Sequence, residues 1–526
     1  MQAGERRRII GEWRKNGNNT VKLRCNCARM SIRKLAKETA IYGVSSIVGR
    51  MLYFLLTPIY TRVLPNPGEY GIATDLFAFT ALLMVFFTYR METAYFRFGS
   101  EADEGSAEKS FNTALWSIVG SSLVFGAILF LLSDWLADLF QYPDKASLVR
   151  MCALILTLDA LCEIPYARLR LESRPIRFAA IRLISIGVNL GLNLFFLLIC
   201  PWLQTTSWGA GLVSGWYDPH FSIGYIFVSN VVASLVALLL LSPIFFRLQW
   251  QFDRALWRRM ALYAAPLVIV GFSYVINETL DRKIMIWFLP GTSDENQAQL
   301  GIYGANYKLA MLISLFTQAF RYGAEPFFFK QKNTLGVQKL YADVARFFLI
   351  AGMAAFLFIV LYIDAVKYFI GPDYWVGLGV VPILTLANVF LGMYYNFSVW
   401  YKVTDKTRWG AYISIGGALI TIGLNIWWIP IFGYYGSAWT TLICYATMAL
   451  ACYFTGKRFY DVPYDLKTMA LYLAVGIVIW QGSDWLRVQF PEALIIRLAL
   501  NTVVLAGLAY WVFIRERSRI RNYFKF

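Results

Sequence analysis

The sequence contains one histidine, His220, among its 526 residues. A single imidazole cannot build a histidine-based metal site or proton relay. Cysteine is scattered, and Cys25 and Cys27 lack the second pair that would complete a zinc site. The sequence shows no metal-ligand cluster, phosphate-binding loop or catalytic triad. We therefore expect no metal, no cofactor and no enzymatic activity.

Charged residues are also scarce, at 15% of the chain, whereas hydrophobic residues make up 58%. A soluble protein carries roughly a quarter charged residues. The apolar residues come in runs of about twenty, the length that crosses a hydrocarbon core of roughly 30 Å. A soluble protein is therefore excluded. The net charge of +17 lies in short loops and in the first 37 residues, not on one face, so nucleic acid is not an expected partner.

The apolar runs predict an all-α polytopic membrane protein with about 14 transmembrane helices. We place the spans at 38–63, 70–90, 110–132, 147–167, 176–200, 221–246, 260–289, 299–321, 343–363, 377–401, 409–428, 434–454, 467–482 and 493–514.

Basic residues decide the expected orientation. The two tails and the even-numbered loops hold most of the 49 Lys and Arg, which places both termini in the cytoplasm. We expect residues 1–37 and 515–526 to be basic cytoplasmic tails, the first held near anionic lipid or given a specific binding role. Translation could start at Met1 or Met30, and we expect no cleavable signal peptide. The longest external loop, 201–220, is too short to hold a domain.

An internal repeat relates two parts of the chain. Leu64-Pro65 matches Leu289-Pro290, and Tyr70-Gly71 matches Tyr303-Gly304. The two copies run in the same direction, six spans apart, which predicts two six-helix lobes related by a parallel repeat. The N-lobe would cover residues 38–246 and the C-lobe 260–454, with two extra C-terminal helices over 467–514. Under this match Asp75 corresponds to Lys308.

Three segments in order resemble a known family. They are GRMLYFLLTPIYTRVL with EYGIA (49–73), DRKIMIWFL with GIYGANYKLA (281–310) and FRYGAEPFFF (320–329). They resemble the polysaccharide-biosynthesis, Wzx-type oligosaccharide–lipid flippases, over residues 31–514. That family shares a superfamily with lipid II flippases and multidrug extruders.

The resemblance implies a function as well as a fold. It implies two lobes around a central cavity that opens to each side in turn, in the bacterial cytoplasmic (inner) membrane. The implied substrate is an oligosaccharide linked to polyprenyl diphosphate, such as an O-antigen repeat unit. Membrane lipids, a polysaccharide polymerase and glycosyltransferases are the expected partners.

Charges inside the spans are the candidate site residues, because each costs roughly 2.5–3.5 kcal/mol to insert and should face protein or water. By the resemblance, helices one, two, seven and eight line the cavity. Cations there would bind the diphosphate, and arginine can do so with two parallel hydrogen bonds. Arg50 would serve this role or form a helix–helix ion pair. The cavity candidates are Arg50, Asp75, Lys308, Arg282 and Lys283.

Three of these cations, Lys308, Arg282 and Lys283, have other possible roles. Lys308 would either bind substrate or form a salt bridge to Asp75 of the other lobe. Arg282 and Lys283 would bind substrate or anchor the outer end of their helix, beside the carboxylates of Glu278 and Asp281.

Four carboxylates are candidates for ion coupling. Asp159 and Glu163 are spaced i, i+4 on one helix face, and Arg182 should lie at the same depth as Glu163. The three would form a structural ion-pair cluster or a proton or sodium site. Glu278 and Asp281 are the other two candidates.

Two other functions fit a polytopic protein. A polysaccharide polymerase or ligase would carry a large external loop, which this chain lacks. A cation-coupled drug exporter of the same superfamily would bind cationic substrates, which Arg50 in the cavity would repel.

Overall fold

The protein is helical throughout the part of the chain that the computed structural model describes, which is residues 47–100, 104–245, 249, 251–331, 336–404 and 406–523. The predicted tail 1–37, with both candidate starts and the Cys25–Cys27 pair, lies outside these residues. The all-α prediction is confirmed for the described ranges.

Eleven helices of the described chain are long and apolar enough to cross a membrane. Two more long helices, α7 (Ala146–Leu171) and α13 (Ser293–Gln331), lie at predicted spans. They fall outside the eleven because charged and polar residues interrupt their apolar runs. The protein is therefore a multi-pass membrane protein.

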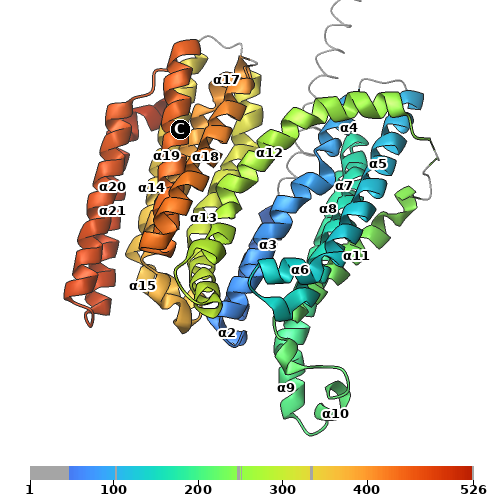
Figure 1. Cartoon of the computed structure of the whole chain (residues 1–526). Helices are drawn as coiled ribbons and strands as arrows, with labels where there is room; N and C mark the ends of the chain where they lie inside the picture. Colours follow the sequence, from blue (N-terminus) through green and yellow to red (C-terminus); the bar gives the residue numbers. More distant parts are fainter. Residues whose placement is uncertain are drawn as a thin grey trace, which may run out of the picture.

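The helices form two groups (Figure 1). The N-terminal group begins with the helical residues 47–55. It continues with α2 (Thr57–Val63), α3 (Pro67–Thr88), α4 (Met91–Ser100), α5 (Glu104–Leu131), α6 (Ser133–Leu139), α7, α8 (Pro175–Leu194), α9 (Cys200–Thr205), α10 (Ala210–Val213) and α11 (Gly224–Phe245).

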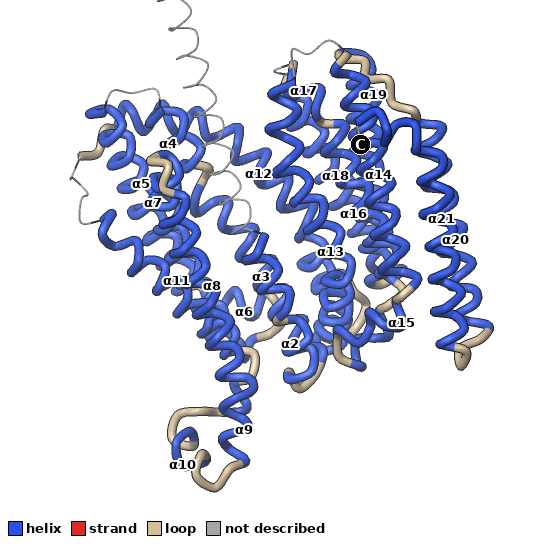
Figure 2. Tube along the Cα trace, turned by 180° about the vertical axis from the view of Figure 1, so that it is seen from behind, coloured by secondary structure: helices blue, strands red, loops and turns tan. Residues whose placement is uncertain are grey.

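The long helix α12 (Arg254–Phe288) crosses from the first group to the second (Figure 1). The C-terminal group comprises α13, α14 (Val337–Leu361), α15 (Ile363–Val366), α16 (Val380–Phe397), α17 (Val399–Val403), α18 (Arg408–Phe432) and α19 (Tyr434–Phe459), followed by α20 (Leu466–Gln489) and α21 (Leu494–Tyr523). The last two helices stand at the edge of the molecule, away from the N-terminal group (Figures 1 and 2).

Side-chain caps fix where key helices begin. The Asn66 side chain accepts a hydrogen bond from the Glu69 amide at 3.0 Å, and Pro67 takes the first position of α3. Asp253 caps α12 in the same way. Such caps satisfy backbone donors that the helix leaves free. They therefore define the first turns of α3 and α12, the helices that meet at the interface between the groups.

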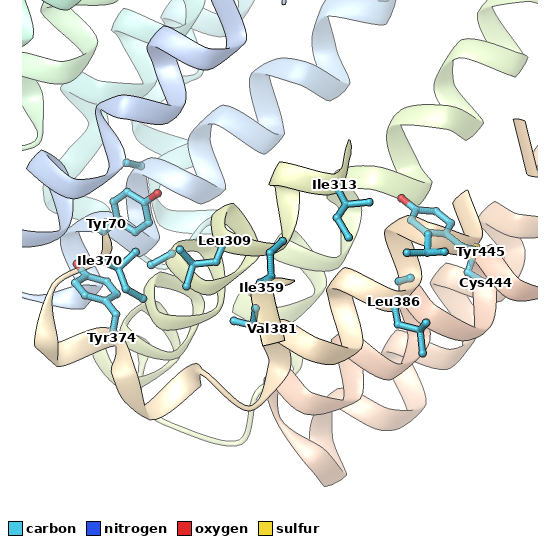
Figure 3. Packing of buried hydrophobic residues seen from close by; sticks show 14 of the residues in the cluster. Tyr70, Leu309, Ile313, Ile359, Ile370, Tyr374, Val381, Leu386, Cys444 and Tyr445 are labelled. Carbon is cyan, nitrogen blue, oxygen red and sulfur yellow. The ribbon is translucent and has the colours of Figure 1, made fainter. Parts of the chain in front are cut away.

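The hydrophobic core extends across the two groups. Tyr70 of α3 packs edge-on against Tyr374 of the C-terminal group, with ring centroids 5.8 Å apart. Ile370 lies beside them, and the core continues through Leu309 of α13 to Val381 of α16 (Figure 3). Buried apolar contacts therefore hold the groups together at this end of the molecule.

The segment between α8 and α11 projects beyond the bundle (Figure 1). It is the predicted external loop 201–220, and it contains α9 and α10. Trp202 and Trp208 are exposed by 56% and 61%. We call this side of the molecule the α10 end, and the side at which α4 ends and α12 begins the α4 end.

The predicted C-terminal tail is largely helical, because α21 runs on to Tyr523. Glu516 is only 1% exposed and pairs with Arg346 of α14. Arg346 also pairs with Asp465, at 2.8 Å. These contacts attach α20 and α21 to the C-terminal group, a link between residues 170 positions apart that hydropathy could not reveal.

Candidate functional site

The two groups meet closely where α3 packs against α13. A Cβ atom at Gly71 would collide with the backbone oxygen of Gln297, and one at Gly301 with that of Pro67. Only glycine permits this approach of two backbones. The Gly371 amide also donates to the Thr61 hydroxyl at 3.0 Å. We call these α3–α13 and Thr61–Gly371 contacts the seal. It lies at the α10 end, and it brings together the two copies of the internal repeat.

A buried ion pair joins the groups beside the seal. The Lys283 ammonium lies 2.5 Å from Asp75 Oδ2, and the Tyr142 hydroxyl donates to the same oxygen at 2.9 Å. Lys283 also lies 3.3 Å from the centroid of the Phe140 ring. The alternative in which Asp75 pairs with Lys308 is therefore wrong. Positions that are equivalent in a repeat need not face each other. Lys283 is buried, so it is not a helix-end anchor.

A central cavity of about 400 Å³ lies next to the seal. On α13 it begins at Gly304 and extends past Lys308, one and two turns beyond Gly301. Arg282 of α12 lines the same cavity, with its guanidinium carbon 4.4 Å from the Tyr307 ring centroid. Glu278 lies one turn before Arg282. The cavity thus contains two cations and one carboxylate.

Asp281 faces away from this cavity, into the C-terminal group. Its carboxylate accepts hydrogen bonds from Tyr303 at 2.7 Å and from Ser437 at 3.1 Å, and it pairs with Arg282 at 2.9 Å. Satisfying a buried carboxylate in this way fixes its neighbours in place. Asp281 therefore orients Arg282 toward the cavity, a role that the sequence did not indicate.

A second cavity, of about 420 Å³, lies within the N-terminal group. Arg50, Asp159, Glu163 and Arg182 all line it, so the structure brings together residues that the sequence treated as two separate features. Arg50 is exposed, as a cavity-facing side chain should be. Tyr53 and Asn230 line both cavities, which makes the two spaces neighbours.

The predicted cluster around Arg182 is looser than expected. Among the residues that the structure describes, Arg182 stacks on aromatic rings and makes no direct ion pair with Asp159 or Glu163. Its guanidinium carbon lies 5.5 Å from the Tyr166 ring centroid and 5.9 Å from that of Phe178. Within the described ranges, the two carboxylates therefore face a polar cavity with no cation in direct contact.

Metal ligands do not gather anywhere in the described ranges: no group of three His, Cys, Asp or Glu could hold an ion there.

A family model described as "Polysaccharide biosynthesis protein" matches residues 35–164 and 179–332, more than half of the chain. The chain belongs to the polysaccharide biosynthesis protein family. This confirms the family predicted from the three sequence segments. No curated protein matches the chain.

Solved structures of transporters share the fold of this family member. The lipid II flippase MurJ in an inward closed conformation aligns with a TM-score of 0.68 at 16% identity, over 92% of this chain and 100% of that one. An inward-facing multidrug resistance MATE transporter of the MOP superfamily aligns with a TM-score of 0.61 at 13% identity, over 77% of this chain and 93% of that one. An outward-facing MATE transporter aligns with a TM-score of 0.54 at 15% identity, over 80% of this chain and 95% of that one. The fold is that of MurJ and MATE transporters.

Proposed function

We propose that this protein carries a saccharide linked to polyprenyl diphosphate across the bacterial cytoplasmic membrane by alternating access, without enzymatic chemistry. The observation that carries the proposal is the pair of cations, Arg282 and Lys308, in a cavity between two helix groups and directly beside a sealed end. Family membership supports a role in polysaccharide biosynthesis.

The charges of the cavity suit this substrate. A diphosphate loses hydration when it leaves the membrane surface, and nearby cations offset that loss. Lys308 supplies a point charge, whereas Arg282 offers a planar fork that matches phosphate oxygens. Glu278 would keep the empty cavity close to neutral. Arg50 in the adjoining cavity would provide a further cation along the path.

The proposal includes an orientation. Fourteen spans in two six-helix lobes, with α20 and α21 added, place both termini in the cytoplasm and the α10 end outside. The seal would then close the outer side while the substrate enters from the cytoplasm. Reporter fusions after Lys402 and Arg515 should report cytoplasm, and one within 201–220 should report the outside. An external C-terminus would contradict the orientation.

Removal of Lys308 tests the site. Lys308→Ala should reach normal membrane abundance yet fail to restore surface polysaccharide in a null strain, and Lys308→Arg should retain part of the export. Arg50→Ala should show a weaker defect of the same kind, because it lies in the adjoining cavity. Arg150→Ala is the matched control, since Arg150 pairs with Asp134 on the surface. Normal export by Lys308→Ala at normal abundance would refute the cationic-cavity mechanism.

A cation-coupled drug exporter is the second candidate, because Asp159 and Glu163 face the polar cavity of the N-terminal group. Carboxylates inside a membrane-spanning bundle that face a polar cavity are suited to proton or sodium coupling. Purified protein in liposomes should move a fluorescent lipid-linked oligosaccharide and not a cationic dye. If Asp159→Asn and Glu163→Gln abolish a pH- or sodium-dependence of that movement, the carboxylates couple it. Dye movement alone would favour the exporter.

Partners follow from the same proposal. Glycosyltransferases would supply the lipid-linked saccharide on the cytoplasmic side, and a polysaccharide polymerase would use it outside.

A further inference from the structure

A third cavity, of about 410 Å³, lies inside the C-terminal group. Helices α12, α13, α16, α17, α18 and α19 form its wall. The wall is rich in tyrosine, with Tyr274, Tyr394, Tyr395 and Tyr401 beside Arg321. The function proposed above does not use this cavity. Sequence patterns could not reveal it, because its tyrosines come from separate segments of the chain.

The tyrosines present both ring faces and polar edges. The Tyr394 and Tyr395 ring centroids are 5.5 Å apart. The Arg321 guanidinium carbon lies 4.9 Å from the Tyr395 centroid, and the Tyr394 and Tyr401 hydroxyl oxygens are 3.3 Å apart. Tyr274 is 40% exposed, so its ring is open to a ligand.

This tyrosine cavity lies next to the central cavity. Asn277 of α12 lines the tyrosine cavity, and the following residue, Glu278, lines the central one. Arg282 lies one turn further along the same helix. If the charged end of a ligand binds Arg282, the adjoining part of the same ligand can therefore reach the tyrosine cavity.

We propose that the tyrosine cavity binds sugar rings of the transported saccharide, an inference that rests on the proposed function. A sugar ring has an apolar C–H face and a rim of hydroxyls. Tyrosine rings offer the negative π face that attracts C–H groups, and their hydroxyls with Arg321 offer partners for the rim. A hydrocarbon tail would offer these polar groups no further hydrogen bonds and would displace water from them, which is unfavourable in a buried site.

The test compares two probes. One is undecaprenyl diphosphate without sugar, and the other is the saccharide-bearing polyprenyl diphosphate extracted from membranes of the null strain. Binding to the purified full chain is measured for Tyr274→Ala, Tyr274→Phe and the control Tyr510→Ala, whose side chain is 68% exposed on α21. Melting temperatures verify that each variant is folded.

Tyr274→Ala should lose about tenfold or more in affinity for the saccharide-bearing probe and keep its affinity for undecaprenyl diphosphate. Tyr274→Phe keeps the ring face and should retain most of the binding, and Tyr510→Ala should match the wild type. Equal loss for both probes would assign the cavity to the lipid part, and no loss for either would remove it from substrate binding. Both results overturn this inference and leave the proposed function intact. A wild-type protein that binds neither probe would overturn both.

Discussion

The contacts between the two helix groups differ sharply between the α10 end and the α4 end. At the α10 end, glycine brings α3 and α13 into backbone contact, and the buried Asp75–Lys283 pair lies beside them. At the α4 end, the first half of α12 packs on α4 and α5 within the core of the N-terminal group, where Met260 and Ala264 are buried, and an ion pair lies at its start. Lys109 and Asp253, 2.6 Å apart, have side chains 49% and 25% exposed. The first end joins the two groups through buried contacts, whereas the ion pair at the second end is partly exposed to solvent.

This difference indicates how the molecule could open. A buried ion pair gains from its partner about what it loses in hydration, so replacing it with water on both charges costs little. A seal made only of apolar side chains would instead expose its whole surface to water on opening. The Asp75–Lys283 pair therefore suits a contact that must form and break in every cycle.

Substitution of the seal glycines should have the largest effect. Gly301→Leu places side-chain atoms where the Pro67 carbonyl lies, so the groups cannot close at the α10 end. We expect complete loss of polysaccharide export at preserved membrane abundance. Gly187→Ala of α8 is the control, because a Cβ there meets open space. Export by Gly301→Leu at the wild-type rate would show that the seal is not part of the cycle.

Removal of one charge from the buried Asp75–Lys283 pair should have the second-largest effect. Asp75→Ala leaves the Lys283 ammonium buried without a carboxylate, which costs roughly 3–5 kcal/mol in soluble precedents. The melting temperature of the purified protein should fall accordingly. The double variant Asp75→Leu, Lys283→Met should recover most of the stability yet export poorly, because an apolar contact opens less readily. A stable Asp75→Ala protein would contradict this account of the interface.

These contacts also show what the sequence could predict. Runs of about twenty apolar residues placed the helices, and the family segments identified the fold, because both signals are local. The partner of Lys283 is 208 positions away, and hydropathy does not encode which helix faces which. The repeat alignment set Asp75 against Lys308, but the contact across the interface joins Asp75 to Lys283. The tyrosine cavity left no local signal at all.

The contact that attaches α20 and α21 lies within the C-terminal group, away from the interface between the groups. A substitution there serves as a comparison for those at the interface. Arg346→Ala removes the Arg346 guanidinium from the buried Glu516 carboxylate, which keeps the Tyr472 hydroxyl as a donor, and we expect a loss of roughly 1–3 kcal/mol in stability. Export should fall only as far as the amount of folded protein falls. Melting temperature and export per molecule, measured together, check this. A loss of export at unchanged stability would give α20 and α21 a direct role in transport.

Substitutions at the α4 end should have the smallest effect on the protein. Hydrogen bonding to Lys109 lowers the pKa of Asp253 to about 2. A lowered carboxyl pKa contributes stability above its unfolded value and loses it as the pH falls through the folded value. The Asp253 carboxylate therefore stays ionised between about pH 8 and pH 5. Lys109→Ala should lower the melting temperature slightly, and by the same amount at both pH values. If the loss in melting temperature depended strongly on pH in this range, a titrating group other than Asp253 would be required.

Thiol labelling of the central cavity tests the central claim most directly. Lys308→Cys is placed in a chain whose native cysteines are replaced, and a membrane-impermeant maleimide is added to right-side-out or inside-out vesicles. The α10-end seal predicts labelling from the cytoplasmic side alone, and labelling from the outside once Gly301→Leu is added. Labelling of the single variant from the outside, with none from the cytoplasm, would contradict a cavity that is sealed at the α10 end.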